Sequence, residues 1–222
     1  MSITPESVTE LLNSEDFGER IRGLNQLRQI EQKTAFEMVK PLVSDENTRV
    51  RYAAVSQLDT LGTIDKNASL ELLRDRLFKD PEPDVQAAAA DAIGGLKLTE
   101  AFEDLDKVYH DTSEWLVQFS IIAALGELGE PKSFPLLKEA LQSNNNLLQT
   151  AAIGSMGELG DSRAVSLLKS FAEHDDWQIR FRLVQALGRL GGEEAKKIIE
   201  KLVDDESEQV AQEAKNNLQS LK

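Results

Sequence analysis

The chain has 222 residues, a formal net charge of −14 and no cysteine, and hydrophobic residues make up 41% of it. That hydrophobic content is enough for a core and too high for a disordered chain. The negative charge disfavours nucleic acid and anionic membrane surfaces as partners, because both are bound through dense clusters of Lys and Arg. The absence of cysteine excludes disulfides, thiolate metal sites and a cysteine nucleophile. We find no signal peptide and no bilayer-spanning stretch, so we expect a cytoplasmic protein without membrane insertion.

Seven similar apolar-periodic segments, called blocks here, recur along the chain. They begin at residues 19, 50, 85, 117, 148, 179 and 210, so successive starts are 31, 35, 32, 31, 31 and 31 residues apart. The clearest copies are Val117–Gly129, Leu148–Gly160 and Ile179–Gly191. With the first residue counted as position 0, positions 0, 4, 8 and 11 are nearly all aliphatic and fall on one side of a helix. Each block is therefore predicted to be an amphipathic helix.

A shorter apolar-periodic helix is predicted before each block. Turn residues such as Asp80–Asp84 separate the two helices, and Leu-Gly pairs end the second one, as glycine does at a helix C-terminus. Pro135 suits a helix start, whereas Pro41 falls inside a first helix and should kink it. One pair cannot bury its own apolar faces, so we expect the pairs to stack into a continuous core.

The pattern thus predicts an all-α protein: a single-domain α-solenoid of about seven antiparallel helix pairs. The predicted repeats span residues 4–31, 34–63, 67–98, 100–130, 133–161, 163–192 and 193–222.

Positions 2, 6 and 9 of the blocks lie opposite the core stripe and form a second stripe. Position 9 is glycine in four central blocks: Gly94, Gly126, Gly157 and Gly188. Glycine inside a helix is unfavourable, so its recurrence indicates a close approach, either of a ligand or of a neighbouring helix.

Aromatic residues gather on the same stripe. Position 2 is Tyr52, Phe119 and Phe181 in three blocks, and Trp115 and Trp177 each lie two residues before a block begins. Since the second helix usually lines the concave face of such a solenoid, these residues are predicted to border a binding groove. The alternative is that the tryptophans staple one repeat to the next.

Arginines accompany these aromatics. Arg51 and Arg180 occupy position 1, and Arg182 lies near Trp177. They are candidates either for a ladder with aspartates of the preceding turn (Asp45, Asp175, Asp176) or for recognition of a carboxylate ligand. No catalytic residue and no metal ligand set stands out, and His110 and His174 suit helix C-termini as cations.

The blocks Glu127–Pro131 and His174–Arg180 resemble the HEAT-like repeat of phycobilisome bilin lyases of the E/F type. The segments Leu96–Leu105 and Ser113–Ser120, together with the start Ser2–Ser7, are similar to lyase-like relatives in that family that act in phycobilisome degradation. The likeness covers essentially the whole chain.

The resemblance implies a phycobilisome degradation factor that binds phycobiliproteins or their bilin chromophores, or other phycobilisome degradation proteins, and assists antenna disassembly. It implies a location at phycobilisomes on the thylakoid surface. It requires no cofactor, and an open-chain tetrapyrrole (bilin) is the candidate ligand. A conventional enzyme is not expected, and any activity would be bilin lyase-like. The alternatives are a bilin lyase or isomerase subunit and a general HEAT-repeat scaffold that binds proteins.

Overall fold

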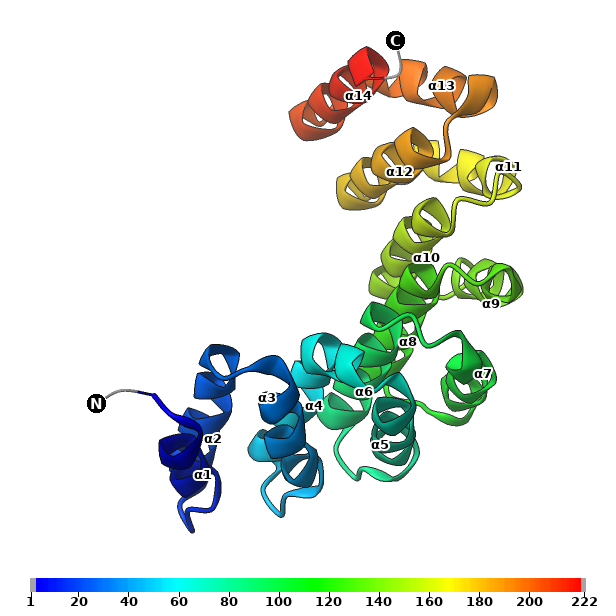
Figure 1. Cartoon of the computed structure of the whole chain (residues 1–222). Helices are drawn as coiled ribbons and strands as arrows, with labels where there is room; N and C mark the ends of the chain where they lie inside the picture. The colour runs from blue at the N-terminus through cyan, green and yellow to red at the C-terminus, as the bar shows by residue number, and fades with distance from the viewer. Residues whose placement is uncertain (1–2, 221–222) are drawn as a thin grey trace. The chain divides into compact units, whose positions relative to one another are not determined.

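A computed structural model describes residues 3–220, and all regular secondary structure in this range is helical (Figure 1). Its fourteen α-helices form the seven predicted pairs, so the predicted fold class is confirmed. The helices are α1 (Pro5–Leu12), α2 (Phe17–Gln26), α3 (Gln32–Val39), α4 (Thr48–Leu61), α5 (Lys66–Lys79), α6 (Pro83–Gly95), α7 (Phe102–Asp111), α8 (Trp115–Leu128), α9 (Phe134–Ala140), α10 (Asn146–Leu159), α11 (Ala164–Leu168), α12 (Trp177–Leu190), α13 (Gly192–Lys201) and α14 (Glu208–Ser220). The last two residues of the seventh predicted repeat, 221–222, and Ser2 lie outside the described residues.

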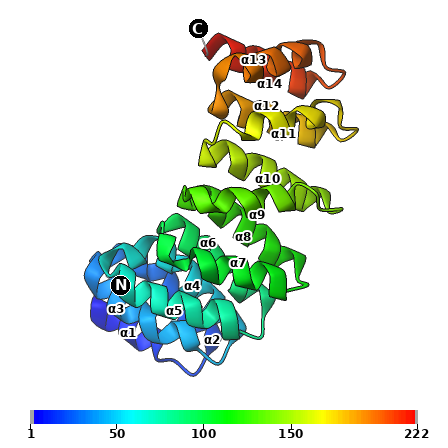
Figure 2. The ribbon, with the colours of Figure 1, turned by 90° about the vertical axis from the view of Figure 1, so that its right-hand side faces the viewer.

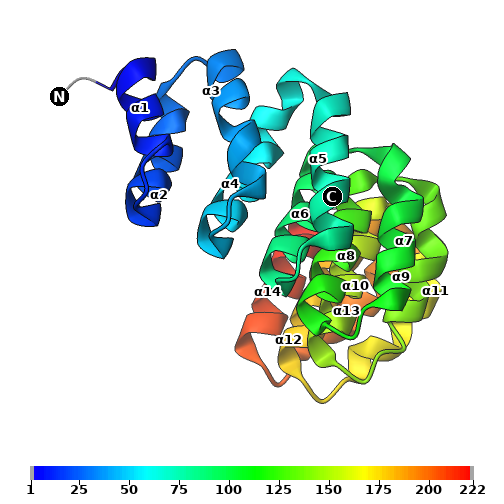
Figure 3. The same ribbon diagram turned by 90° about the horizontal axis from the view of Figure 1, so that it is seen from below.

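The chain divides into two compact units, with the boundary inside α8 between Ile121 and Ile122. In the first unit the pairs α1–α2, α3–α4 and α5–α6 follow one another (Figure 3). In the second unit α9–α10, α11–α12 and α13–α14 are layered in chain order (Figure 2). The assignment of all seven repeats to one domain stays a prediction. No helix among the described residues is long and apolar enough to cross a membrane.

Local sequence explains where the helices begin and end. The side chains of Asn47, Asn145 and Asp176 cap the first turns of α4, α10 and α12 by accepting backbone N–H bonds. At the other end of α10, Gly160 adopts the left-handed conformation with φ of +71°. The interruption predicted at Pro41 is confirmed, because α3 stops at Val39 and a 3-10 helix covers Lys40–Ser44.

The predicted core stripe is buried. In α12 the residues at positions 0, 4 and 8 are Ile179, Leu183 and Leu187, and all three have no exposed surface. First helices of the same unit contribute Leu168 and Ile199 to this interior, also without exposed surface. The apolar faces of the second helices therefore form the core against the first helices, as the helical period requires.

Buried arginines at position 1 join successive repeats. Arg51 Nε and Nη2 donate to the two carboxylate oxygens of Asp80 at 2.7 and 2.9 Å, and Asp80 lies in the turn after α5, one repeat onward. Arg51 Nη1 donates to the carbonyl oxygens of Asp45 and Glu46 in its own preceding turn, at 3.0 and 3.2 Å. Arg20 makes the same kind of bridge to Asp45. One guanidinium thus closes its own turn and holds the next repeat.

The ladder differs in one respect from the sequence-based interpretation. The carboxylate partner of Arg180 is Asp205 of the following repeat, with Nε to Oδ2 at 2.8 Å, whereas the preceding turn supplies only the carbonyl oxygens of His174 and Asp175. The reason is geometric: the first turn of α12 directs the Arg180 side chain between two adjacent loops. In the middle of the chain Gln118 takes over the carbonyl contacts by donating to Tyr109 and Thr112 at 3.3 Å.

These ion pairs shift the titration of their acids. Burial alone would raise the pKa of Asp80, but the hydrogen bonds from Arg51 and from the Glu82 amide outweigh it, so that the pKa lies below its ordinary value. The pKa of Asp205 is also lowered, first by the hydrogen bonds from Arg180. A carboxyl whose folded pKa is lowered stabilises the fold above its unfolded pKa, and this stabilisation is lost as pH falls through the folded value.

Truncation of the core stripe should be costly. Leu187→Ala removes a side chain with no exposed surface, so we expect a loss of about 2–5 kcal/mol in the free energy of unfolding because a cavity remains. Urea denaturation checks this, with Gln178→Ala on the exposed side of the same helix as the matched control. A loss near zero would show that the core stripe is misplaced.

Loss of a ladder arginine should destabilise the fold in a pH-dependent way. Arg51→Gln removes the bidentate partner of the fully buried Asp80 carboxylate and leaves it only Arg76 Nη1 at 3.2 Å. We expect a loss of about 2–3 kcal/mol at pH 7, below the about 3–5 kcal/mol of a wholly unpaired buried charge. The difference from the parent should shrink below about pH 4, where protonation of Asp80 removes the charge with which Arg51 pairs. Denaturant titrations at both pH values measure it. Lys79→Gln, which breaks an exposed pair with Asp75, should change stability by less than about 1 kcal/mol.

Candidate functional site

The second-helix face is defined here as positions 2, 6 and 9 of the blocks together with the residues that begin these helices. In the second unit its aromatic centre lies on α12. Trp177 begins this helix and is 42% exposed, and its ring meets the half-buried Phe181 edge-on, with 6.4 Å between ring centroids. The Asp176 side chain caps the helix by accepting a hydrogen bond from the Gln178 amide at 2.9 Å. This cap fixes the first turn of α12, and with it the position of Trp177. The two rings form a continuous apolar patch, here called the aromatic pair, that is open to solvent.

A shallow cavity adjoins the aromatic pair. It has a volume of about 350 Å³ and lies between Phe181 on α12 and the polar side of α14. Its α14 wall consists of Glu208, Gln209, Gln212, Glu213 and Asn216. Phe181 therefore presents one side to Trp177 and the other to a wall of acids and amides.

Arg182 lies on the other flank of the same helix and crosses α10 at Gly154. A β-carbon on Gly154 would be 3.4 Å from Arg182 Cδ, so the aliphatic stem of the arginine rests on the bare α10 backbone. Arg182 is exposed, donates to Gln185 Oε1 at 3.2 Å, and makes no ion pair with any residue in the range 3–220. Its charge is available to an anionic ligand, whereas Arg189 on the same helix is bound to Glu158 at 2.6 Å.

Arg180, also predicted for this site, is placed differently. It is 5% exposed, and its five N–H groups make five hydrogen bonds: two to Asp205, one to Glu206 and two to backbone carbonyls. Every donor is engaged, so the structure supports the ladder interpretation of Arg180 rather than recognition of a carboxylate. Of the two neighbouring arginines, only Arg182 faces solvent.

The first unit carries the remaining predicted residues. Trp115 begins α8 and is 48% exposed, and Phe119 follows one turn later and is half-buried, as Phe181 follows Trp177. Tyr52 on α4 is 48% exposed. The aromatic residues thus lie on the predicted face within each unit. A groove shared by Trp115 and Trp177 stays a prediction, because they belong to different units.

Two acids on the second-helix face were not singled out from the sequence. Asp59 holds position 9 of α4, where other blocks have glycine, and its Oδ1 lies 1.8 Å from the point that a β-carbon on Gly95 of α6 would occupy. The pKa of Asp91 on α6 is raised, first by burial of its carboxyl and then by the negative charge of Asp59, while a hydrogen bond with Ser120 opposes the rise. The Asp91 residue as a whole is nevertheless exposed to solvent. Asp59 and Asp91 therefore form a polar part of the second-helix face and not a buried acidic site. The sequence signal that could have identified Asp59 is an acid at position 9, where four other blocks have glycine.

The position-9 glycines answer a question that the sequence left open. A β-carbon on Gly126 would be 2.7 Å from Ser155 Cα, and one on Gly157 would be 2.7 Å from Ala186 Cα. In both places the obstacle is the backbone of the next second helix. Gly126 and Gly157 therefore permit close packing of helices and do not form a floor for a ligand, whereas the neighbour of Gly188 is the Asn217 side chain. No group of three or more metal-ligating side chains is found among the described residues.

The comparison with protein families agrees with this architecture. A model described as HEAT repeats matches residues 5–80, 70–155 and 140–219, so the chain belongs to the HEAT-repeat family. No curated relative matches it by sequence.

Solved structures share the fold over the full chain. The complex of CpcE and CpcF of phycocyanin lyase from Nostoc sp. PCC7120 is similar with a TM-score of 0.66 and 22% identity, covering 100% of this chain and 96% of that chain. An archaeal HEAT-like repeats protein from Thermococcus onnurineus NA1 has a TM-score of 0.62 and 15% identity, covering 100% and 98%. An engineered protein has a TM-score of 0.60 and 17% identity, covering 98% of this chain and 68% of that one. At these identities the likeness establishes the fold.

Two glycines of α10 should respond oppositely to the same substitution. Gly157→Ala drives a methyl group into the α12 backbone, so we expect a loss of about 1–3 kcal/mol in stability. Gly154→Ala meets only the Arg182 side chain and reduces the freedom of the unfolded chain, so we expect no loss or a gain of about 0.5–1 kcal/mol. Thermal and urea denaturation of both variants decides it. Equal losses would mean that position 9 has no special packing role.

Proposed function

We propose that this protein is a phycobilisome degradation factor that binds phycobiliproteins and/or their bilin chromophores through its second-helix face and assists antenna disassembly. The observation that carries the proposal is the exposed Trp177–Phe181 pair beside the available charge of Arg182 on α12. Support also comes from the likeness, over the whole chain, to the CpcE–CpcF complex of phycocyanin lyase.

The chemistry of a bilin matches this surface. An open-chain tetrapyrrole is a flat conjugated plate with two propionate groups, so it requires aromatic contact along its faces and a cation at its edge. Trp177 and Phe181 supply the aromatic contact, and Arg182 supplies a guanidinium that no acid of the described chain neutralises. Arg180 is not part of this proposal, because its donors are all used within the fold.

Two other functions compete with this one. The likeness to a phycocyanin lyase complex favours a bilin lyase or isomerase subunit, which would transfer the chromophore to an apo-phycobiliprotein. Membership in the HEAT-repeat family favours a scaffold that binds proteins and no pigment. Pigment binding separates the scaffold from the first two functions, and transfer of the pigment separates the lyase from the degradation factor.

Titration of the purified protein with free bilin tests the proposal. We expect a red-shifted or sharpened absorbance band, and a loss of about 1–3 kcal/mol in binding free energy for Trp177→Ala because an aromatic contact disappears. Arg182→Gln should weaken binding of the propionate-bearing ligand as well. Phe78→Ala removes another exposed aromatic ring, on the first helix α5, and should leave the affinity unchanged.

Circular dichroism of each variant controls for folding. If Trp177→Ala stays folded and binds both bilin and phycobiliprotein like the parent, the aromatic pair is a packing feature and the proposal fails. Mixing the protein and bilin with apo-phycobiliprotein, and separately with intact phycobiliprotein, then distinguishes attachment of the pigment from antenna disassembly.

A further inference from the structure

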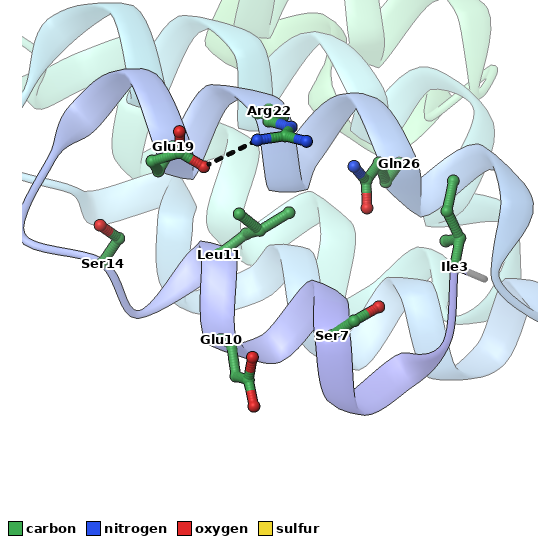
Figure 4. Close-up of a pocket in the computed structure, with 8 residues that line it drawn as sticks. All are labelled: Ile3, Ser7, Glu10, Leu11, Ser14, Glu19, Arg22 and Gln26. Carbon is green, nitrogen blue, oxygen red and sulfur yellow. Dashed lines mark hydrogen bonds and ion pairs between the residues drawn. The ribbon is translucent and has the colours of Figure 1, made fainter. Parts of the chain in front are cut away.

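A separate cavity lies on the first helix pair, within the first unit. It has a volume of about 690 Å³ and runs between α1 and α2, with Leu11 at its centre and Ile3 at one end (Figure 4). Gly23 brings the two helices together, since a β-carbon there would be 3.0 Å from Leu11 Cβ. Leu11 and Ile3 remain partly exposed in the described structure. The first pair thus presents a groove with an apolar centre and polar borders on the side that faces away from α3 and α4.

The last helix pair shows a different outer surface. Apart from Gly192, the exposed residues of α13 are all charged: Glu193, Glu194, Lys196, Lys197, Glu200 and Lys201. A repeat array needs a polar outer surface where stacking stops. The α13–α14 pair has one, whereas the α1–α2 pair has a groove with Leu11 at its centre.

The charge around this groove is mainly negative. Glu10 and Glu19 line it, and Glu6, Glu15 and Asp16 are exposed on the same helix pair and the loop between its helices. Arg22 is the cation in the lining, and its Nη1 forms an ion pair with Glu19 Oε2 at 3.4 Å (Figure 4). A second copy of this chain would bring the same acids and a net charge of −14 to the contact, so self-association is disfavoured.

We propose that the groove between α1 and α2 binds a cationic amphipathic helix of a partner protein. The groove is formed by an antiparallel helix pair, the surface on which helices of the next repeat pack elsewhere in the chain, so a helix fits it by the same geometry. The apolar side of the bound helix covers Leu11 and Ile3, and Lys or Arg residues on its flanks meet Glu10 and Glu19.

Fluorescence anisotropy with two synthetic helices tests the proposal on the full chain. One peptide carries leucines at i, i+3, i+4 and i+7 flanked by lysines, and the other carries the same leucines flanked by glutamates. We expect the lysine peptide to bind at least about tenfold more tightly, and this preference to fall as salt increases. Glu10→Gln with Glu19→Gln should weaken binding of the lysine peptide about threefold to tenfold.

The matched control is Glu193→Gln with Glu194→Gln, which removes the same charge at the α13–α14 pair and should leave binding within about twofold. Leu11→Gln and Gln26→Trp probe the groove itself: the first removes the central apolar contact, and the second fills the space from α2 without altering Leu11. Both should abolish binding of the lysine peptide while circular dichroism stays unchanged. The proposal is overturned if the control weakens binding as much as the groove variants, if Gln26→Trp has no effect, or if sedimentation shows that the chain forms dimers or filaments through this groove.

Discussion

Close contact between consecutive second helices is the constraint on which the rest of the structure depends. At Gly126 and Gly157 the next helix comes so near that a β-carbon would lie 2.7 Å from its Cα atoms. This contact sets the separation of the helices, and with it the distance between side chains on the second-helix face. Because Gly126 and Gly157 at position 9 pack against the next helix, they cannot contact a ligand. The positions available for ligand contacts are 2 and 6 and the residues that begin the helices. Trp177, Phe181 and Gly154 occupy those places.

The arginines are likewise divided between packing and binding. Arg51 and Arg180 lie in nearly identical hydrogen-bond networks, in which each donates to carbonyl oxygens of its own turn and to the aspartate of the next repeat. A guanidinium with all donors engaged and almost no exposed surface stabilises the stack but offers nothing to a ligand. Arg182, two residues after Arg180, is exposed to solvent and its stem packs over Gly154. The repeat thus separates the arginine that holds the repeats together from the one that is available for binding.

The molecule offers two surfaces of different chemistry. The second-helix face of α12 carries aromatic rings beside the available cation Arg182, which suits a flat ligand bearing carboxylates. The outward groove of α1 and α2 combines aliphatic side chains with acids, which suits a cationic helix. Both belong to a fold that many HEAT-repeat proteins share, so function has to be assigned from these surfaces rather than from the fold.

The sequence by itself determined the helix pairs, their register and the core stripe, because these follow from a helical period repeated at nearly constant spacing. It also placed Tyr52, Trp115 and Trp177 on the exposed side of their helices, which the structure confirms. Only the tertiary structure decided that the carboxylate partner of Arg180 is Asp205 rather than an aspartate of its own turn, that Gly126 and Gly157 face a neighbouring backbone, and that the charge of Asp59 contributes to the raised pKa of Asp91. The physical reason is the same in all three cases. A sequence pattern fixes the direction of a side chain on its own helix, whereas its partners come from adjacent repeats whose distance depends on packing.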